Sequence, residues 1–373
     1  MNLHKKILMV ALMLMMSIAT FAQTEGGHEA AGEGSGEAFN PGPFIMNHIG
    51  DSYEWHIATF GDKDAPEEKK FHLSLPLPCI LYSEQSGFHI FMSSNFHHGH
   101  AEYEGFKISD AEPTKGKIVE VATGERPWDF SITKNVFAML FSMCLICFIF
   151  IGMRKYYQRN IGKAPHGFYN AVEMLVLFVR DDIAYASLGK KNGDKFMPFL
   201  MTVFFFIFIN NLLGLVPILP GGANLTGNIA VTCVLALFTF IITTFSGNKE
   251  YWQDIFWPHG VPVWLKCPPI IPIVEIMGVF TKPIVLMVRL FANITAGHII
   301  ALSFYSLIFI FGAKSVAAGY GVASVSVLFT IFMSLLELLV AFIQAYVFTL
   351  LSSIYFSMAV GGEHEEKAVE VAH

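Results

Sequence analysis

One arginine in this chain lies where a charge is costly. Arg289 falls within Ile284–Phe311, a run of 28 residues that contains no other Asp, Glu, Lys or Arg. A guanidinium group stays charged at physiological pH, and placing it near the centre of a bilayer costs about 2.5–3.5 kcal/mol on insertion scales. A helix that serves only as an anchor has no use for such a group. Arg289 therefore indicates a functional site with a partner.

Few other polar groups interrupt the last two apolar segments, and their helical spacing is informative. Asn293 lies four residues after Arg289, on the same face of a helix. His298 lies nine residues after Arg289, on the opposite face and about 13.5 Å further along. In the last segment Gln344 follows Glu337 by seven residues, on nearly the same face and about 10.5 Å away.

These groups fall into register if the two helices are antiparallel. With Gln344 level with Arg289, His298 and Glu337 lie at similar depth, one on each helix. A His and a carboxylate in that setting are suited to proton relay. Glu275 precedes Arg289 by 14 residues and lies within about 40° of its face, toward the other side. The pattern predicts two polar access routes separated by a permanent cation.

Simpler structural roles remain open for the single residues. An amide such as Gln344 or Asn293 is typical of hydrogen bonds between membrane helices. Glu275 suits an interfacial position beside Lys282. Arg289 would also be accommodated by a structural ion pair with Glu337 or Glu275, and Asn210 and Asn211 by capping a bend.

The composition indicates the class of protein in which these polar groups lie. The chain is 54% hydrophobic, with a mean hydropathy of +0.52 and only 14% charged residues, which excludes an ordinary soluble domain. The fold class predicted is an all-α polytopic membrane protein with a small β-rich N-terminal module. Its five predicted spans are Val136–Met153, Phe196–Pro217, Gly227–Ser246, Pro272–Phe311 and Val322–Val360. The last has 39 residues, about 58 Å as a helix against a core of ~30 Å, so the final pair must tilt steeply or bend.

Two cues give the same orientation. Residues 1–22 resemble a secretory signal peptide, although a retained anchor helix is an alternative. The loop 154–195 carries eight basic residues and is therefore predicted to be cytoplasmic. The block 23–130 is then periplasmic, residues 131–360 form the membrane domain, and the tail 361–373 is cytoplasmic.

The block 23–130 differs in character from the rest. It begins with a flexible Gly/Glu/Ala-rich stretch, Thr24–Ala38, and continues in short strand-like runs. Its 18 Asp and Glu against 7 Lys and Arg do not predict attraction to phospholipid head groups or nucleic acid. It holds eight of the 14 histidines, including His97-His98-Gly99-His100, but no regular ligand spacing, so a solvated loop is favoured over a metal site.

At these residues the chain resembles subunit a of the F-type ATP synthases. The stretch from Arg289 to His298 (RLFANITAGH) is similar to that family's arginine motif, and Glu337 and Gln344 match the paired positions on its last helix. Asn210 to Pro217 (NNLLGLVP) resembles the signature of its second span. The resemblance covers roughly Trp128–Met358 and also touches Asn47-His48-Ile49.

The resemblance implies a function. Arg289 would face a rotating ring of c subunits and separate two half-channels, with His298 and Glu337 on the periplasmic route and Glu275 on the cytoplasmic one. The further residues implied for the pathway are Gln344, Asn293 and, as secondary polar lining, Asn210 and Asn211. The partners implied are the c ring, the b-subunit stalk, the rest of the complex and the lipid bilayer of a bacterial inner membrane. No catalytic residue, cofactor or metal is implied.

Two features depart from the usual family pattern. Many bacterial members carry a carboxylate at the position of His298 and a histidine at that of Glu337, whereas here the pair is exchanged. The N-terminal block is also longer than usual, and the family implies no role for it.

Other classes of protein fit less well. A proton-coupled transporter of another family should show an internal hydropathy repeat, and the five spans show none. A membrane cytochrome needs paired axial histidines, and His298 is the only histidine clearly at membrane depth. A membrane-anchored metal-capturing module would leave the arginine pattern without a use.

Overall fold

The computed structural model describes most of the chain between residues 41 and 361. The described residues are 41–42, 45, 49–60, 71–99, 101–109, 111, 114–163, 165–216, 222–257 and 270–361. The expected signal peptide, the flexible stretch Thr24–Ala38 and the tail beyond Gly361 lie outside them, as do His48, His100 and Pro217.

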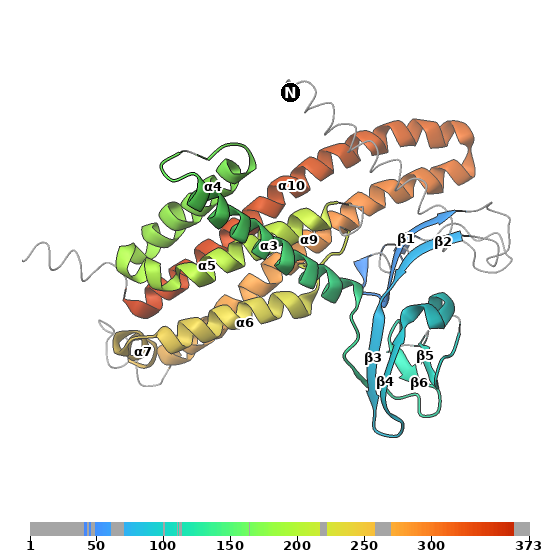
Figure 1. Cartoon of the computed structure of the whole chain (residues 1–373), viewed down its shortest axis with the longest axis horizontal. Coiled ribbons are helices and arrows are strands. Elements are labelled where there is room, and N and C mark those ends of the chain that lie inside the picture. Colours follow the sequence, from blue (N-terminus) through green and yellow to red (C-terminus); the bar gives the residue numbers. More distant parts are fainter. Residues whose placement is uncertain are drawn as a thin grey trace, which may run out of the picture. The chain divides into compact units, whose positions relative to one another are not determined.

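The chain divides into two compact units. Unit 1 comprises Met1–Phe141, Leu213–Asn224 and Ile299–Phe332, and unit 2 comprises Ser142–Leu212, Leu225–His298 and Met333–His373. Unit 1 contains the strands shown in blue and cyan in Figure 1, and unit 2 contains most of the helical residues.

The predicted β-rich module is confirmed, and its described strands form three small antiparallel sheets. Their strand orders are β1-β2, β4-β3-β7 and β5-β6. A 3-10 helix, η2 (Ser93–Gly99), follows β4. The strands are β1 (Glu54–Phe60), β2 (Phe71–Pro76), β3 (Pro78–Ser83), β4 (Gly87–Met92), β5 (Phe106–Ile108), β6 (Ile118–Glu120) and β7 (Trp128–Asp129).

One aromatic core holds this module together. Alternate residues of β3 and β4 point to opposite faces of their sheet, and Cys79, Leu81 and Phe91 point inward. They join Tyr53, Phe96, Phe106 and Ile118 in one buried cluster. Burial, together with a hydrogen bond from the Tyr53 hydroxyl to Asp129, raises the pKa of Tyr53. Burial also raises the pKa of the Cys79 thiol to about 12.

Among the described residues, five apolar helices are long enough to cross a membrane, as the hydropathy pattern predicts. The first is α3 (Lys134–Arg159) and the third α6 (Ile229–Ser246). The second comprises α4 (Phe168–Phe178), the π-helical η3 (Val179–Tyr185) and α5 (Ala186–Gly214), with a kink at Gly189, whose backbone angles are not helical. A short helix, α7 (Lys249–Phe256), follows α6, and the last two are α9 (Ile270–Lys314) and α10 (Val316–Val360).

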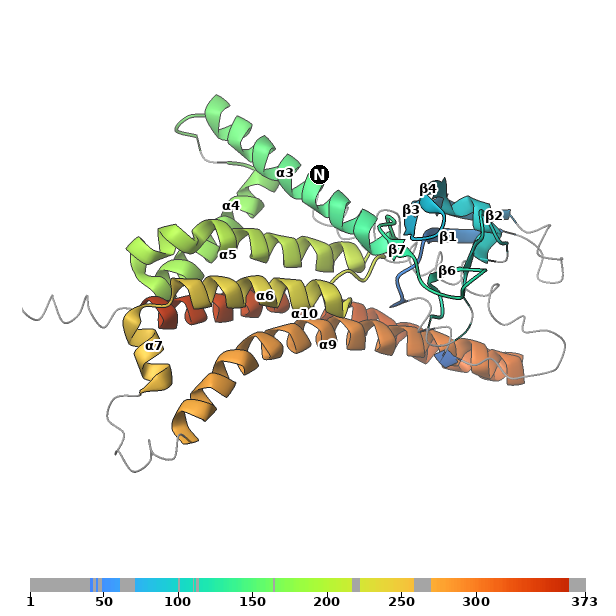
Figure 2. The same ribbon diagram turned by 90° about the horizontal axis from the view of Figure 1, so that it is seen from below.

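The last two helices form an antiparallel pair of 45 residues each. Along α9, Lys282 lies over the ring of Tyr355, Gly297 lies beside Glu337, and Phe304 stacks on Phe329. The residue number of the partner on α10 thus falls as the residue number on α9 rises, which shows that the helices are antiparallel. Pro283 lies inside α9 without ending it, and Figure 2 shows that this helix curves along its length.

Candidate functional site

Arg289 is exposed on α9, on a face that is otherwise apolar. Ile284, Val285 and Val288, in the turn before it, are exposed large hydrophobic residues. Asn293, one turn later, is also exposed. Among the described residues no carboxylate forms an ion pair with Arg289, so the structural pairs with Glu337 or Glu275 are absent there. A fixed cation is therefore presented outward from the middle of a membrane helix.

The α10 helix also has an exposed apolar face. Leu335, Leu336, Leu339 and Ile343 are exposed along one side of this helix. An apolar surface this long is typical of contact with lipid or with another membrane subunit. Lipid offers no counter-charge to a guanidinium group, so the arginine favours contact with a protein that supplies one.

The structure brings His298 and Glu337 together between the two helices. His298 Nδ1 lies 3.8 Å from Glu337 Oε1, an ion-pair distance if the imidazole is protonated. Both side chains are largely covered, with relative exposures of 21% and 15%. Glu337 Oε1 is buried, and within the described part of the chain it has no hydrogen-bond partner. Leaving a buried acceptor unpaired costs about 1–3 kcal/mol.

Glycine makes this approach possible. A Cβ atom built at Gly297 would lie 2.6 Å from Glu337 Oε1, which is closer than any real contact. A side chain at this position would force the Glu337 carboxylate to move, so glycine allows it to lie where it does against α9.

One of the two amides of α5, Asn211, proves to be a buried link to other segments rather than a bend cap. Asn211 donates to the carbonyl of Ala341 on α10 (3.3 Å) and accepts from the Thr226 hydroxyl (2.6 Å). Ala341 lies about one turn from both Glu337 and Gln344, so this link fixes α10 at the level of the site. Asn210 is also buried, but it bonds the carbonyl of Phe206 in its own helix.

Gln344 is buried on α10, with 4% of its surface exposed. Within the described residues no hydrogen bond joins it to Arg289, although the antiparallel pairing puts the two at similar levels. Glu275 is exposed on the first turns of α9 and interacts electrostatically with Lys282. The structure thus brings His298 and Glu337 together and leaves Arg289, Asn293 and Glu275 facing outward.

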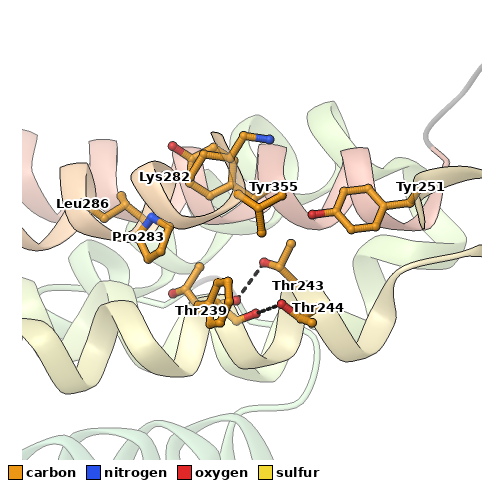
Figure 3. A pocket seen from close by; sticks show the side chains of 10 residues that line it. Thr239, Thr243, Thr244, Tyr251, Lys282, Pro283, Leu286 and Tyr355 are labelled. Carbon is orange, nitrogen blue, oxygen red and sulfur yellow. Dashed lines mark hydrogen bonds between the residues drawn. The ribbon is translucent and has the colours of Figure 1, made fainter. Parts of the chain in front are cut away.

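A small pocket on the other side of Arg289 was not predicted from the sequence. Figure 3 shows its lining, in which Lys282 of α9, Tyr355 of α10 and Tyr251 of α7 lie opposite threonines of α6. The Lys282 Nζ atom lies 5.5 Å from the centre of the Tyr355 ring. The α6 residues in the lining are Thr239, Phe240, Thr243 and Thr244.

A proline adds a polar backbone group at this pocket. Pro283 has no N–H, so the carbonyl of Val279, four residues earlier, cannot accept the usual helical hydrogen bond. Both residues line the pocket. The sequence signal that points here is the pair Thr239 and Thr243, four residues apart and both buried on one face of α6.

Taken together, fold and site define a multi-pass membrane protein with an outward-facing cation and a covered His–carboxylate pair between its last two helices. Residues 136–357 match the model of the ATP synthase A chain family, and residues 44–135 match a domain of unknown function, DUF8433. The chain belongs to the ATP synthase subunit a family. Subunit a is a non-catalytic proton-channel subunit of the ATP synthase membrane sector and assembles with the rest of the F-type complex.

The curated relatives include ATP synthase subunit a proteins of several bacteria. That of Chlorobium phaeobacteroides (strain DSM 266) is 37% identical over 366 residues, 94% of this chain and 85% of its own length. That of Chloroherpeton thalassium is 43% identical over 248 residues, 65% of this chain and 70% of its own. ATP synthase subunit a 2 of Chlorobaculum tepidum is 36% identical and covers 91% of this chain and 80% of its own length. The first and third of these similarities extend into the β-rich block.

Proposed function

We propose that Arg289 faces the ring of c subunits and separates two half-channels for protons. The observation that carries this proposal is the exposure of Arg289 on an otherwise apolar face of α9. Because the described residues supply no counter-charge, the partner is expected to be a carboxylate of another membrane subunit. Each ring carboxylate would lose its proton beside the guanidinium group and regain one after passing it.

The two half-channels are assigned to polar groups on either side of Arg289. His298 and Glu337 would serve the periplasmic route, because their pairing lets one group accept a proton that the other releases. Glu275 would serve the cytoplasmic route, joined by the pocket at Lys282 and Tyr355. Gln344, Asn293, Asn210 and Asn211 would line the space between. Each charge that crosses 100 mV gains about 2.3 kcal/mol, which the ring would convert into rotation.

The proposal also includes the orientation of the chain in the membrane. Arg154, Lys155 and Arg159 end α3, and the positive-inside rule assigns that end to the cytoplasm. The β-rich module, at the other end of α3, would then be periplasmic and the C-terminus cytoplasmic. The b-subunit stalk is the further partner that the family implies.

The proposal is tested by ATP-driven proton pumping in inverted membrane vesicles that carry Arg289→Ala. Co-purification of the c ring checks assembly, and Thr202→Ala, at an exposed hydroxyl on α5, is the matched control. We expect an assembled complex without pumping, together with a passive proton leak. Normal pumping by an assembled Arg289→Ala complex would mean that the arginine is structural.

A second experiment tests the pair. The single variants His298→Glu and Glu337→His each leave two like groups facing one another, whereas the double variant restores a His–carboxylate pair in exchanged order. We expect the double variant to pump better than either single variant. A double variant no better than the worse single one would show that the two groups do not act together.

A further inference from the structure

The sheet β4-β3-β7 is apolar on both faces. Its inner face carries Cys79, Leu81 and Phe91 of the aromatic core. A sheet with one face in water normally alternates apolar and polar residues, but here the outward positions are apolar as well. They form a surface, called here the aromatic face, made of Tyr82, Phe88, Ile90, Met92, Trp128 and Phe130.

The register makes these side chains one continuous surface. Tyr82 pairs with Phe88 on one side and with Trp128 on the other, and Ile80 pairs with Ile90. Four of the six residues, Phe88, Ile90, Trp128 and Phe130, are 61–66% exposed. Cross-strand neighbours on one face lie about 4.5–5.5 Å apart, close enough for these side chains to touch. In this register no described polar residue stands between them. Such a surface indicates a binding partner.

The chain leads from this face directly into the membrane. Phe130 ends the patch, and α3 begins four residues later at Lys134. Four residues reach at most about 13–14 Å, whereas the head-group layer adds roughly 5–8 Å on each side of the hydrocarbon core. The aromatic face therefore lies within reach of the leaflet at which α3 enters.

The connection is rigid rather than a loose linker. The backbone N–H of Lys134 donates to Ser52 (2.9 Å), and that of Asn135 donates to the Asp51 carboxylate (3.1 Å). The Trp55 ring packs edge-on against Phe137 of α3, 5.6 Å away. All of these residues belong to unit 1. The direction in which α3 leaves the module is thus fixed by the module itself.

The α3 helix leaves the module on the same side of the sheet as the aromatic face. In Figures 1 and 2, β5, β6 and η2 cover one side of β3 and β4, and the first turns of α3 leave on the other side. The uncovered side carries the aromatic face. Trp and Tyr are the residues that membrane proteins place at the level of the head groups.

We propose that the aromatic face rests on the lipid bilayer at the leaflet where α3 enters, with Phe88, Ile90 and Trp128 inserted among the head groups. The contact is apolar, because the block that carries it has a net charge of −11 and gains nothing from anionic lipid. The module would thus be held flat against the membrane. This inference does not depend on the roles proposed for the α9–α10 site.

The test measures how deep a label on the aromatic face lies in lipid. The full chain is used with Cys79 retained, since it is buried, and with the other cysteines replaced by alanine: Cys144, Cys147, Cys233 and Cys267. A spin label is attached through Ile90→Cys in the face or through Lys107→Cys, an exposed position on β5. Collisions with oxygen, which partitions into lipid, and with a water-soluble nickel chelate are compared in phosphatidylcholine nanodiscs.

We expect the label at Ile90 to collide often with oxygen and rarely with the nickel chelate. The label at Lys107 should collide often with the nickel chelate and less often with oxygen. Equal access of nickel to both labels would place the face in water and overturn the proposal. A label at Ile90 reached by neither reagent would mean that protein covers the face, either the N-terminal segment or a second copy, and would also overturn it.

A second arm separates apolar contact from electrostatic attraction. Part of the phosphatidylcholine is replaced by phosphatidylglycerol, and the oxygen-to-nickel ratio at Ile90 is expected to stay unchanged. A lipid signal that appears only with the anionic lipid would contradict an apolar contact. Both labelled positions are exposed, so neither substitution disturbs the core.

Discussion

The helix bundle and the β-rich module both bury apolar side chains, but the bundle also links its segments through buried hydroxyls and amides. Inside the bundle, hydroxyls and amides meet between helices: Thr239 contacts Ser352 (3.4 Å), Ser187 contacts Ser353, and Thr226 donates to Asn211. The module instead buries one cluster of aromatic and aliphatic residues around Phe106.

The difference follows from the solvent around each region. In lipid, apolar side chains gain nothing by leaving the surroundings, so helices associate through small residues and hydrogen bonds. In water, burial of apolar surface supplies about 25 cal/mol per Å² and drives folding. The aromatic face breaks the rule for a water-exposed module, which is why it indicates contact with the bilayer.

The largest effect on this comparison is expected from Phe106→Ala in the module core. Loss of a fully buried phenylalanine typically costs about 3–5 kcal/mol. The rate at which a maleimide alkylates Cys79, buried in the same cluster, should rise by roughly two to nearly four orders of magnitude in the full chain. Phe88→Ala, on the outward face, is the matched control and should leave that rate unchanged. If both variants raised the alkylation rate of Cys79 equally, Phe88 would have to be part of the buried core, contrary to a sheet with one buried and one exposed face.

Alkaline pH should loosen the module next. The folded state keeps the Cys79 thiol neutral because burial raises its pKa from 9.0 to about 12, whereas the unfolded chain ionises it from pH 9 upward. Stability is therefore complete below pH 9 and is lost as the pH rises toward 12. One proton accounts for at most about 1.4 kcal/mol per pH unit.

The pH effect is measured as the midpoint of denaturant unfolding, followed by the near-UV signal of the module. Cys79→Ala should flatten its pH dependence between 9 and 12, although the buried Tyr53, whose pKa is also raised, keeps part of it. A midpoint that rises with pH would have the wrong sign for this explanation.

In the bundle, Gly297→Ala should have an intermediate effect. The new Cβ would meet the Glu337 carboxylate at 2.6 Å, and overpacking of this kind costs about 1–3 kcal/mol. Gly278→Ala on the same helix, with open space around it, should be neutral or stabilising by about 0.5–1 kcal/mol. The free energy of unfolding in SDS-containing micelles checks both. Similar costs for the two variants would mean that α9 and α10 do not pack closely at Glu337.

The smallest effect is expected from Ser352→Ala, which removes the hydroxyl contact between α10 and α6. Hydrogen bonds between membrane helices contribute about 0.6 kcal/mol on average. Ser324→Ala, whose exposed hydroxyl bonds only the carbonyl of Tyr320 in its own helix, is the control. A double-mutant cycle with Thr239→Val measures the coupling, and a value near zero would show that the contact does not contribute.

Much of the fold was predictable because hydropathy and helical spacing are local properties. The five spans and the antiparallel last pair follow from the run lengths and the periods of Arg289, His298 and Glu337. The pocket at Lys282 was missed because its residues come from α6, α7, α9 and α10, and no local pattern joins four helices. Asn211 was interpreted as a possible bend cap because its partner, Ala341, is 130 residues away.

The sequence by itself determined that a permanent cation interrupts a long apolar segment, since neither composition nor charge depends on folding. It also determined how far His298 lies from Arg289 along one helix and how far Gln344 lies from Glu337 along the other, because helical rise is the same in every helix. Only the tertiary structure decided which groups touch: that Glu337 lies against Gly297, that Arg289 faces outward, and that both faces of β4-β3-β7 are apolar. Those facts depend on which helix or strand packs beside which, and packing is set by the whole chain at once.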